Sequence, residues 1–491
     1  MDKYSFLNSA NTAYFAELYD QYLKSPDTVE PSWRAFFQGF DFGQENGTSQ
    51  IEVDNLVPEN IQKEFQVVKL IDAYRNRGHL FTKTNPVRAR RSYSPNLDFQ
   101  NFGLEEKDLK TVFSAGEIMG IGSSTLAEII NHLQQIYCDS IGIEYMYIRN
   151  PVKVNWIQKK LNVNTNHPKF TSDQKKHILS KLNEAVSFEN FLHTKFVGQK
   201  RFSLEGGESL IPAIDSIIDL AADKGVEEFV MGMAHRGRLN TLINIFGKSA
   251  KDIFNEFQGK DYDEEMLFDG DVKYHMGWTC KRDTDSGKKI NLNIAPNPSH
   301  LETVGAIVQG ITRAKQEDDF SGDLSKVLPI IIHGDAAIAG QGLPYEIVQM
   351  AGLKGYRTGG TIHIVVNNQI GFTTNYLDAR TSTYCTDVGK VTLCPIFHVN
   401  ADDVEAVIHA ALFALEYRME FNQDVFIDLL GYRKYGHNEG DEPRFTQPKL
   451  YKAIAKHKNP KQIYSEILLS QGVIDQKHLS QIEKDYRQML D

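Results

Sequence analysis

Short apolar runs alternate with segments of helical periodicity in the second part of this sequence, and this alternation restricts the fold more than any other feature. It begins at about residue 205, and the runs occupy residues 227–234, 289–295, 327–334, 361–368 and 424–432. Strands that alternate with helices are joined by crossover connections, which produce a parallel sheet covered by helices on both faces. Residues 201–491 are therefore predicted to form an α/β domain with a mostly parallel sheet.

The first part of the chain has a helical pattern instead. Tyr14, Leu18 and Tyr22 form one stripe within residues 1–40, and Pro31 suits the first turn of a second helix. Residues 41–58 are polar and have no stripe, so they are interpreted as a linker. Residues 59–200 return to helical periodicity, with loops between the segments, and are predicted to form a mostly helical domain.

Composition and charge exclude several classes of protein. The 491 residues carry a formal net charge of -10, which argues against binding to a nucleic-acid backbone. No stretch approaches the roughly 18 apolar residues of a membrane span, and the N-terminus has the pattern of neither a secretory signal nor a mitochondrial presequence. The four cysteines show no CxxC spacing, so we expect free thiols in a reducing cytoplasm and no zinc site.

Polar side chains come directly after the predicted strands, at the point where each strand ends. They are His235 and Arg236, Ser299 and His300, Asp335, Asn368, and Arg433 and His437. The carboxyl ends of parallel strands lie at one edge of a sheet, where ligands bind in folds of this kind. One polar residue after a strand is ordinary, but so many indicate a common site.

Asp335 and Asn368 are the strongest candidates within this set. They lie 33 residues apart, about the length of one loop, helix and strand, so both could stand at neighbouring strand ends. Their side-chain oxygens suit a hard cation such as Mg²⁺, which keeps further positions for phosphate oxygens. The small residues Ala336 and Ala337 would let a diphosphate approach the backbone. The alternative is structural, with Asp335 capping a helix and Asn368 closing a turn.

The motifs around these residues resemble those of thiamine-diphosphate enzymes, and in particular the decarboxylating subunit of 2-oxoglutarate dehydrogenase. HGDAAIAGQG, with HIVVNNQIGFTT after it, is similar to the Gly-Asp-Ala version of the cofactor motif in that subunit. Further segments resemble the same family in the same order: LIDAYRNRGHL, KFVGQKRFSLEGGESLIPA, MAHRGRLNTL, GDVKYHMG, NPSHLE and YRKYGHNEGDEPRFTQP. The resemblance covers essentially the whole chain and implies a transketolase-like thiamine-diphosphate-binding domain.

The resemblance also implies roles for individual residues. Asp335 and Asn368 would bind Mg²⁺ through their side chains and Ile370 through its backbone carbonyl, while Arg236 would contact the phosphate side of the cofactor. Ser299, Leu301, Ala336 and Ala337 would line the cofactor cleft. His235 and His275 would face the 2-oxo acid, because an imidazole can pair with a carboxylate or relay a proton.

Each of these roles has a simpler alternative. His235 could cap the helix that starts near Gly237, and His275 could lie on a surface loop. Arg236 and Arg238 could form a solvated basic pair. His437 and Glu439 in GHNE are assigned mainly to the ordering of their own loop.

The function that the resemblance implies is the oxidative decarboxylation of 2-oxoglutarate in the tricarboxylic acid cycle. Thiamine diphosphate and Mg²⁺ would be the cofactors, and the succinyl group would pass to the lipoyl arm of a partner acyltransferase. Dihydrolipoyl dehydrogenase would be the third component, and the full-length form is expected to be a homodimer that binds neither nucleic acid nor membrane. The alternatives are a decarboxylase of a related 2-oxo acid such as 2-oxoadipate, or a non-catalytic fragment that docks through residues 1–40.

Members of the family that this chain resembles carry a second α/β domain after the cofactor domain. That second domain would bind the aminopyrimidine ring, whereas residues 449–491 are charged, of helical type, and unlike it. We therefore expect a chain that is inactive by itself.

Overall fold

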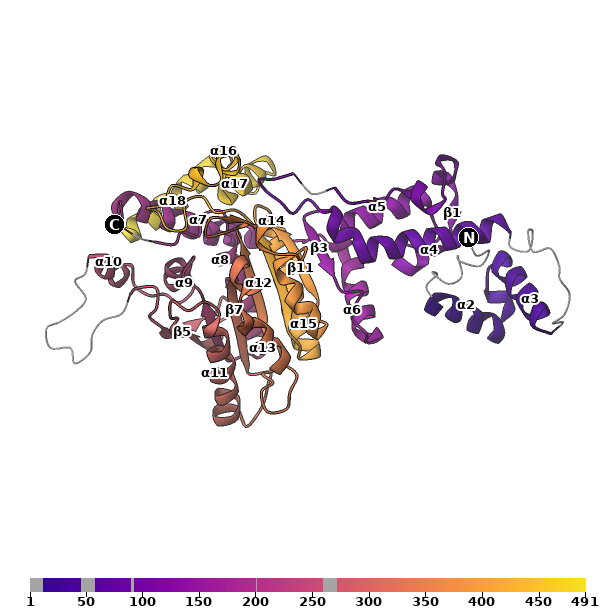
Figure 1. Cartoon of the computed structure of the whole chain (residues 1–491), viewed down its shortest axis with the longest axis horizontal. Helices are drawn as coiled ribbons and strands as arrows, with labels where there is room; N and C mark the ends of the chain where they lie inside the picture. Colours follow the sequence, from indigo (N-terminus) through magenta and orange to yellow (C-terminus); the bar gives the residue numbers. More distant parts are fainter. Residues whose placement is uncertain (1–11, 46–57, 90–91, 200, 259–271) are drawn as a thin grey trace. The chain divides into compact units, whose positions relative to one another are not determined.

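The computed structural model describes residues 12–45, 58–89, 92–199, 201–258 and 272–491, and they divide into two compact units (Figure 1). One unit contains the N-terminal region with residues 91–139 and 155–166. The other contains residues 83–90, 140–154 and 167–491. No helix within these described ranges is long and apolar enough to cross a membrane.

The N-terminal unit is helical, as predicted. Its main helices are α2 (Thr12–Lys24), α3 (Pro31–Glu45), α4 (Glu59–Arg77) and α5 (Leu126–Tyr137). Tyr22, Trp33 and Phe37 pack with Ile61 and Phe65 of α4 in one buried aromatic cluster. Helix α3 runs into the segment predicted as a linker, of which residues 46–57 lie outside the described residues. The side chain of Tyr14 also lies outside them.

The larger unit is built on an eight-stranded sheet, which confirms the predicted α/β class. Its order is β3 (Ile141–Glu144), β11 (Ile396–Asn400), β12 (Val425–Leu430), β8 (Ile362–Asn367), β7 (Val327–Gly334), β4 (Glu228–Met233), β6 (Lys289–Ile294) and β5 (Trp278–Asp283). The six inner strands are parallel, and the edge strands β3 and β5 are antiparallel to their neighbours. All five predicted runs form inner strands, whereas β3, β5 and β11 were not predicted.

Helices form two layers against this sheet (Figure 1). One layer contains α7 (Ser172–Lys195), α8 (Leu210–Asp223), α9 (Arg238–Asn244) and α15 (Val404–Phe421), which pack on one another. The other contains α11 (Thr303–Phe320), α12 (Asp335–Gly340), α13 (Gly342–Met350) and the 3₁₀ segment η8 (Cys385–Thr392). Crossover connections between parallel strands are right-handed. Because the connections of the first layer run along the sheet in the opposite direction from those of the second layer, the two layers lie on opposite faces.

Further helices lie between the first strands of the sheet and after its last strand. Helix α6 (Pro151–Asn162) comes before α7, and α10 (Ala250–Gln258) comes before β5. At the end of the chain are α16 (Pro448–Ile454), α17 (Pro460–Ser470) and α18 (Gln476–Leu490), as the helical pattern of residues 449–491 predicted. Helices α17 and α18 pack on α7, so this last segment belongs to the larger unit.

The sheet is buried on both faces. Every residue of β4 and β8 is buried, and so is all of β7 except its last residue. The polar residues at the ends of these strands therefore come at the first point where the chain leaves the core.

Candidate functional site

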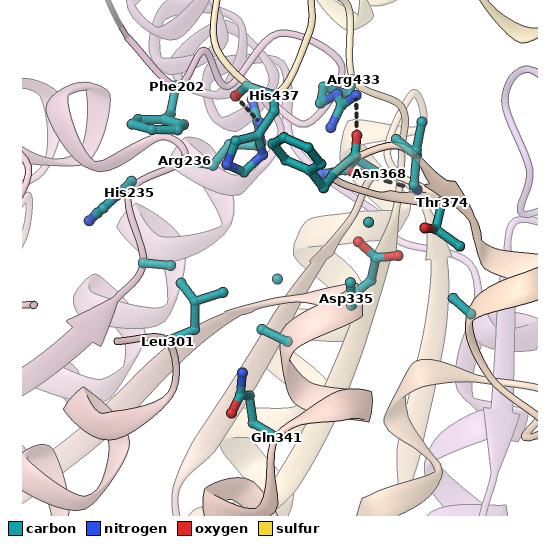
Figure 2. Close-up of a pocket in the computed structure, with 18 of the residues that line it drawn as sticks. Phe202, His235, Arg236, Leu301, Asp335, Gln341, Asn368, Thr374, Arg433 and His437 are labelled. Carbon is teal, nitrogen blue, oxygen red and sulfur yellow. Dashed lines mark hydrogen bonds between the residues drawn. The ribbon is translucent and has the colours of Figure 1, made fainter. Parts of the chain in front are cut away.

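A cavity of about 760 Å³ lies at the carboxyl ends of the inner strands (Figure 2). It collects residues that the sequence analysis proposed from four separate segments: His235, Arg236, Ser299, Leu301, Asp335, Ala336, Ala337, Asn368 and Ile370. His275 is outside the lining but adjoins it, because its Nε2 lies 3.1 Å from Ser299 Oγ. The candidate residues thus share one place in the structure, while their chemical roles stay predictions.

Asp335 is the first residue after β7 and is 2 % exposed. Burial and the nearby Asp428 raise the pKa of its carboxyl to about 6, although Arg380 and hydrogen bonds from the backbone of Asp335 and Asn368 lower it. Arg380 Nη1 is 3.9 Å from Asp335 Oδ2, too far for a hydrogen bond. The helix-capping alternative is wrong, because Gly334 occupies the cap position of α12 and has no side chain to cap it. A buried carboxylate that has no hydrogen bond to Arg380 fits a nearby cation.

Asn368 comes after β8 and closes a tight turn. Its Oδ1 accepts the Ile370 backbone N–H at 3.3 Å, and Gln369 between them has a φ of 66°. The turn is held from behind, since Gln369 Nε2 donates to the Gly431 carbonyl at 2.7 Å. Asn368 therefore closes a turn, as the structural alternative proposed, and it also lines the cavity.

The turn and α12 approach each other closely, which explains the small residues on this wall. A Cβ added to Gly371 would lie 2.6 Å from the Cβ of Ala336. No ordinary side chain fits in that space, and the cavity wall here consists mainly of backbone. Backbone N–H groups and carbonyls without covering side chains are what a diphosphate and its cation need for close approach.

Two arginines lie at another part of the cavity (Figure 2). Arg236 donates to the Ser203 carbonyl at 2.7 Å and to the His437 carbonyl at 3.0 Å. Arg433 donates to the Phe372 carbonyl at 3.0 Å. Burial, and then Arg433, lower the pKa of Arg236 to about 10, so its guanidinium keeps its charge at neutral pH.

The solvated-pair alternative for the arginines is wrong. Arg238 is fully buried and donates to the carbonyls of Met233, Met276 and Ala295 at 2.7 to 3.1 Å. It fixes the segments after β4 and β6, whereas Arg236 lines the cavity. The two neighbouring arginines therefore have different tasks, which their spacing in the sequence could not reveal.

The imidazoles form an aromatic corner of the site. The ring of His235 lies 5.0 Å from that of Phe202 and 5.2 Å from that of His275, between centroids. Its Nε2 is buried and has no hydrogen-bond partner among the described residues. Burial, and then His275, lower the pKa of His235 to about 4, so the ring is neutral at pH 7. A neutral, unpartnered imidazole nitrogen can accept or donate one hydrogen bond to a ligand.

Three cavity residues were given no role from the sequence, although two of them were among the polar residues expected at this edge of the sheet. His437 and Arg433 come after β12, and the rule that polar residues after strands gather at one edge already applied to them. Burial, and then Arg236 and Arg433, lower the pKa of His437 to about 4. Phe202 comes from the segment before α8, where no periodic pattern marks it.

Comparison with known proteins identifies the family of this chain. The sequence model described as "Dehydrogenase E1 component" matches residues 180–491, and the one described as "2-oxoglutarate dehydrogenase N-terminus" matches residues 4–44. Proteins named "2-oxoglutarate dehydrogenase E1 component" from Cupriavidus necator and Azotobacter vinelandii are each 42 % identical, and one from Haemophilus influenzae is 41 % identical. Each alignment covers 99 % of this chain and 54 % of the relative, so the chain spans about half the length of these curated relatives. The chain belongs to the dehydrogenase E1 component family.

Proposed function

We propose that this chain takes part in the oxidative decarboxylation of 2-oxoglutarate and binds thiamine diphosphate through Mg²⁺. One observation carries the proposal: a single cavity joins the buried Asp335, whose pKa is raised, with Asn368, Ile370, two arginines and the neutral imidazole of His235. The names of the relatives point to the same substrate. The succinyl group would pass to a lipoyl-bearing acyltransferase, with dihydrolipoyl dehydrogenase as the further component, and we place the enzyme in the cytoplasm.

The residues present fit the metal and the cofactor. The Asp335 carboxylate, the Asn368 side-chain oxygen and the Ile370 carbonyl offer the hard oxygen ligands that Mg²⁺ prefers. Where Gly371 meets Ala336 there is no room for a larger side chain, so the backbone is accessible there. Arg236 supplies a fixed positive charge for a diphosphate.

Thiamine diphosphate, when bound, supplies the electron sink that allows a 2-oxo acid to lose carbon dioxide. The protein contributes position and proton control. His235 and His275 would hold the 2-oxo acid through hydrogen bonds, and the neutral His235 could take up or deliver a proton. Phe202 and Leu301 would exclude water from the reacting end of the cavity.

Calorimetric titration of the whole enzyme with thiamine diphosphate and Mg²⁺ tests the cofactor site. The wild type should bind only when Mg²⁺ is present, and Asp335→Ala should weaken binding by at least about 100-fold, since even residues that merely orient a metal ligand contribute about 10–100-fold. Asp252→Ala, at an exposed position of α10, is the matched control and should bind normally. Equal affinity of the wild type and Asp335→Ala would remove Asp335 from the site.

Turnover of the whole enzyme with an artificial electron acceptor tests the substrate. A preference for 2-oxoglutarate over 2-oxoadipate is expected. The reverse preference would leave the cofactor site in place but replace the proposed substrate.

A further inference from the structure

The loop formed by residues 436–442 brings His437 to the cavity, although it belongs to no helix or strand. It lies between β12 and the 3₁₀ turn at Pro443–Phe445. Its internal hydrogen bonds are local, such as the one from the Gly440 N–H to Asn438 Oδ1 at 2.9 Å. The position of the His437 ring therefore depends on how the loop is attached to the rest of the unit.

One attachment is the side chain of Glu439, and it reaches a buried arginine. Glu439 Oε2 accepts the Arg201 backbone N–H at 3.1 Å, and Glu439 Oε1 lies 3.3 Å from Arg201 Nε. Both carboxyl oxygens of Glu439 are thus engaged by one residue. Another polar attachment is the hydrogen bond from Arg236 to the His437 carbonyl at 3.0 Å.

Arg201 is itself fixed by two further carboxylates. It is 2 % exposed, and its Nη1 donates to Glu189 Oε2 of α7 at 2.6 Å. Its Nη2 donates to Glu205 Oε2 at 3.4 Å. The loop is therefore anchored to a rigid, buried ion-pair cluster that also holds the segment leading to Phe202 at the cavity wall.

We propose that Glu439 and Arg201 form a clasp that holds His437 against the cofactor cavity, which makes Glu439 a positioning residue for the proposed reaction. This inference rests on the proposed function only for its catalytic consequence. The clasp itself is a property of the folded chain and is measured without substrate. Glu439 is not among the described residues that line the cofactor cavity.

Protons can reach the clasp because Glu439 lines a second cavity of about 670 Å³ on the other side of the loop. Burial raises the pKa of its carboxyl to about 7, although Arg201 lowers it. Charged and titratable groups face it from several elements: Arg201 and Glu205 before α8, Glu189 on α7, Arg236 after β4 and Tyr274 before β5. Because the carboxyl has a higher pKa in the closed loop than it would have when exposed, the closed loop takes up the proton first, and the clasp should not loosen as the pH falls through 7.

Hydrogen exchange of the peptide that contains residues 436–442 tests the clasp in the 491-residue chain. Glu439→Gln keeps the shape of the side chain, and it should speed exchange in this peptide about tenfold, the factor expected from one charge-assisted hydrogen bond. Glu442→Gln is the matched control in the same loop, because Glu442 pairs with the exposed Arg444 beside it, and it should exchange like the wild type. Equal exchange in Glu439→Gln and the wild type would overturn the clasp.

The wild-type chain provides a second measurement that needs no variant. After correction for intrinsic rates, its exchange at residues 436–442 should not increase as the pH falls from about 8 to about 6, because the closed loop takes up the proton before an open loop does. In parallel, NMR should show the pKa of His437 moving from about 4 toward its ordinary value in Glu439→Gln, as the ring leaves its buried position near Arg236 and Arg433. Faster exchange of the wild type at the lower pH, or an unchanged His437 pKa, would contradict the proposal.

The catalytic consequence is tested separately in the whole enzyme. Glu439→Gln should lower kcat for 2-oxoglutarate about tenfold while the Kd for thiamine diphosphate stays within about threefold of the wild type, because His437 is moved and the metal ligands are not. If the wild type binds no thiamine diphosphate, the proposed function fails and the exchange data still decide the clasp. If the loop loosens while kcat is unchanged, the clasp stands and its positioning role falls.

Discussion

Replacing Asp335 by asparagine is expected to stabilise the ligand-free chain and, at the same time, to abolish its Mg²⁺-dependent affinity for thiamine diphosphate. Asp335 is 2 % exposed, and its pKa is raised to about 6, mainly by burial. The ordinary value for aspartate is about 3.9, so the folded state disfavours the charged form by about two pKa units, or roughly 3 kcal/mol at 1.36 kcal/mol per unit. Asparagine keeps the shape without the charge, so unfolding at neutral pH should cost about 2–3 kcal/mol more in the variant.

The sign of this effect can be checked by its pH dependence. Because the pKa is higher in the folded state than in the unfolded chain, the folded wild type takes up the proton first as the pH falls. Its stability should therefore rise between about pH 6 and pH 4, a gain that the asparagine variant cannot show. The advantage of the variant should be full near pH 7.5 and should disappear near pH 4.

Urea unfolding without Mg²⁺ across this pH range measures the stability difference, and calorimetric titration measures the loss of cofactor affinity. Asp252→Asn, at the exposed position on α10, serves as the control and should change neither quantity. A variant that is less stable at neutral pH would show that Arg380 compensates Asp335 well enough to refute the argument from burial. A stability difference that does not vary with pH would refute it as well.

Three further predictions concern the cavity and the sheet. Gly371→Ala should weaken cofactor binding and destabilise the fold by about 1–3 kcal/mol, because the added Cβ would lie 2.6 Å from the Cβ of Ala336. Gly310→Ala on α11 is the control, because its Cβ meets open space and should not destabilise the fold. Thermal unfolding and cofactor titration compare the two variants. His235→Gln should lower turnover of the whole enzyme about 10²–10⁴-fold with near-normal cofactor affinity, and near-wild-type rates would exclude a proton-transfer role. Burial lowers the pKa of His398, but two flanking carboxylates raise it to about 9. The stabilisation that the charged His398 gives is therefore full below about pH 6.5 and is lost as the pH rises through 9. In urea unfolding, His398→Gln should flatten this dependence of stability on pH, and a flat wild-type profile would contradict the prediction.

The sheet was most predictable in its centre. Four of the five predicted strands, β4, β7, β8 and β12, are nearly fully buried and mostly apolar, as inner parallel strands are. The fifth, β6, alternates between apolar and polar residues. Strand β5 carries Lys281, Arg282 and Asp283 because it lies at an edge and alternates between half-buried and exposed residues. Such a pattern resembles a loop when the neighbouring strand is unknown.

Strand β11 was missed for a different reason. His398 interrupts its apolar run, yet it is 1 % exposed in the structure. Its Nδ1 lies 2.9 Å from Asp428 of β12 and its Nε2 lies 2.9 Å from Glu144 of β3. The partners that make this burial tolerable lie 30 and 254 residues away, so no local pattern could indicate them.

The candidate site was predictable as a set of residues but not as a set of contacts. Parallel strands deliver the residues after their carboxyl ends to one edge, and this rule alone brought His235, Asp335 and Asn368 together. It could not show that Arg236 would be held by two carbonyls or that Arg380 would stand near Asp335. These contacts depend on loops, where side chains are placed by packing and not by periodicity.

The charges of the cavity explain why its stability and its proposed ligand are linked. The Asp335 carboxylate is compensated by backbone hydrogen bonds and by Arg380 at 3.9 Å, yet burial still raises its pKa. Burial, and then Arg433, lower the pKa of Arg236, and both arginines donate to backbone carbonyls. Each end is therefore costly in the ligand-free fold. Mg²⁺ would add positive charge beside Asp335, and a diphosphate would add negative charge toward the arginines, so one metal-diphosphate unit would relieve both costs at once. Binding of Mg²⁺ alone or of diphosphate alone relieves only one, which is why the affinity for each should depend strongly on the presence of the other.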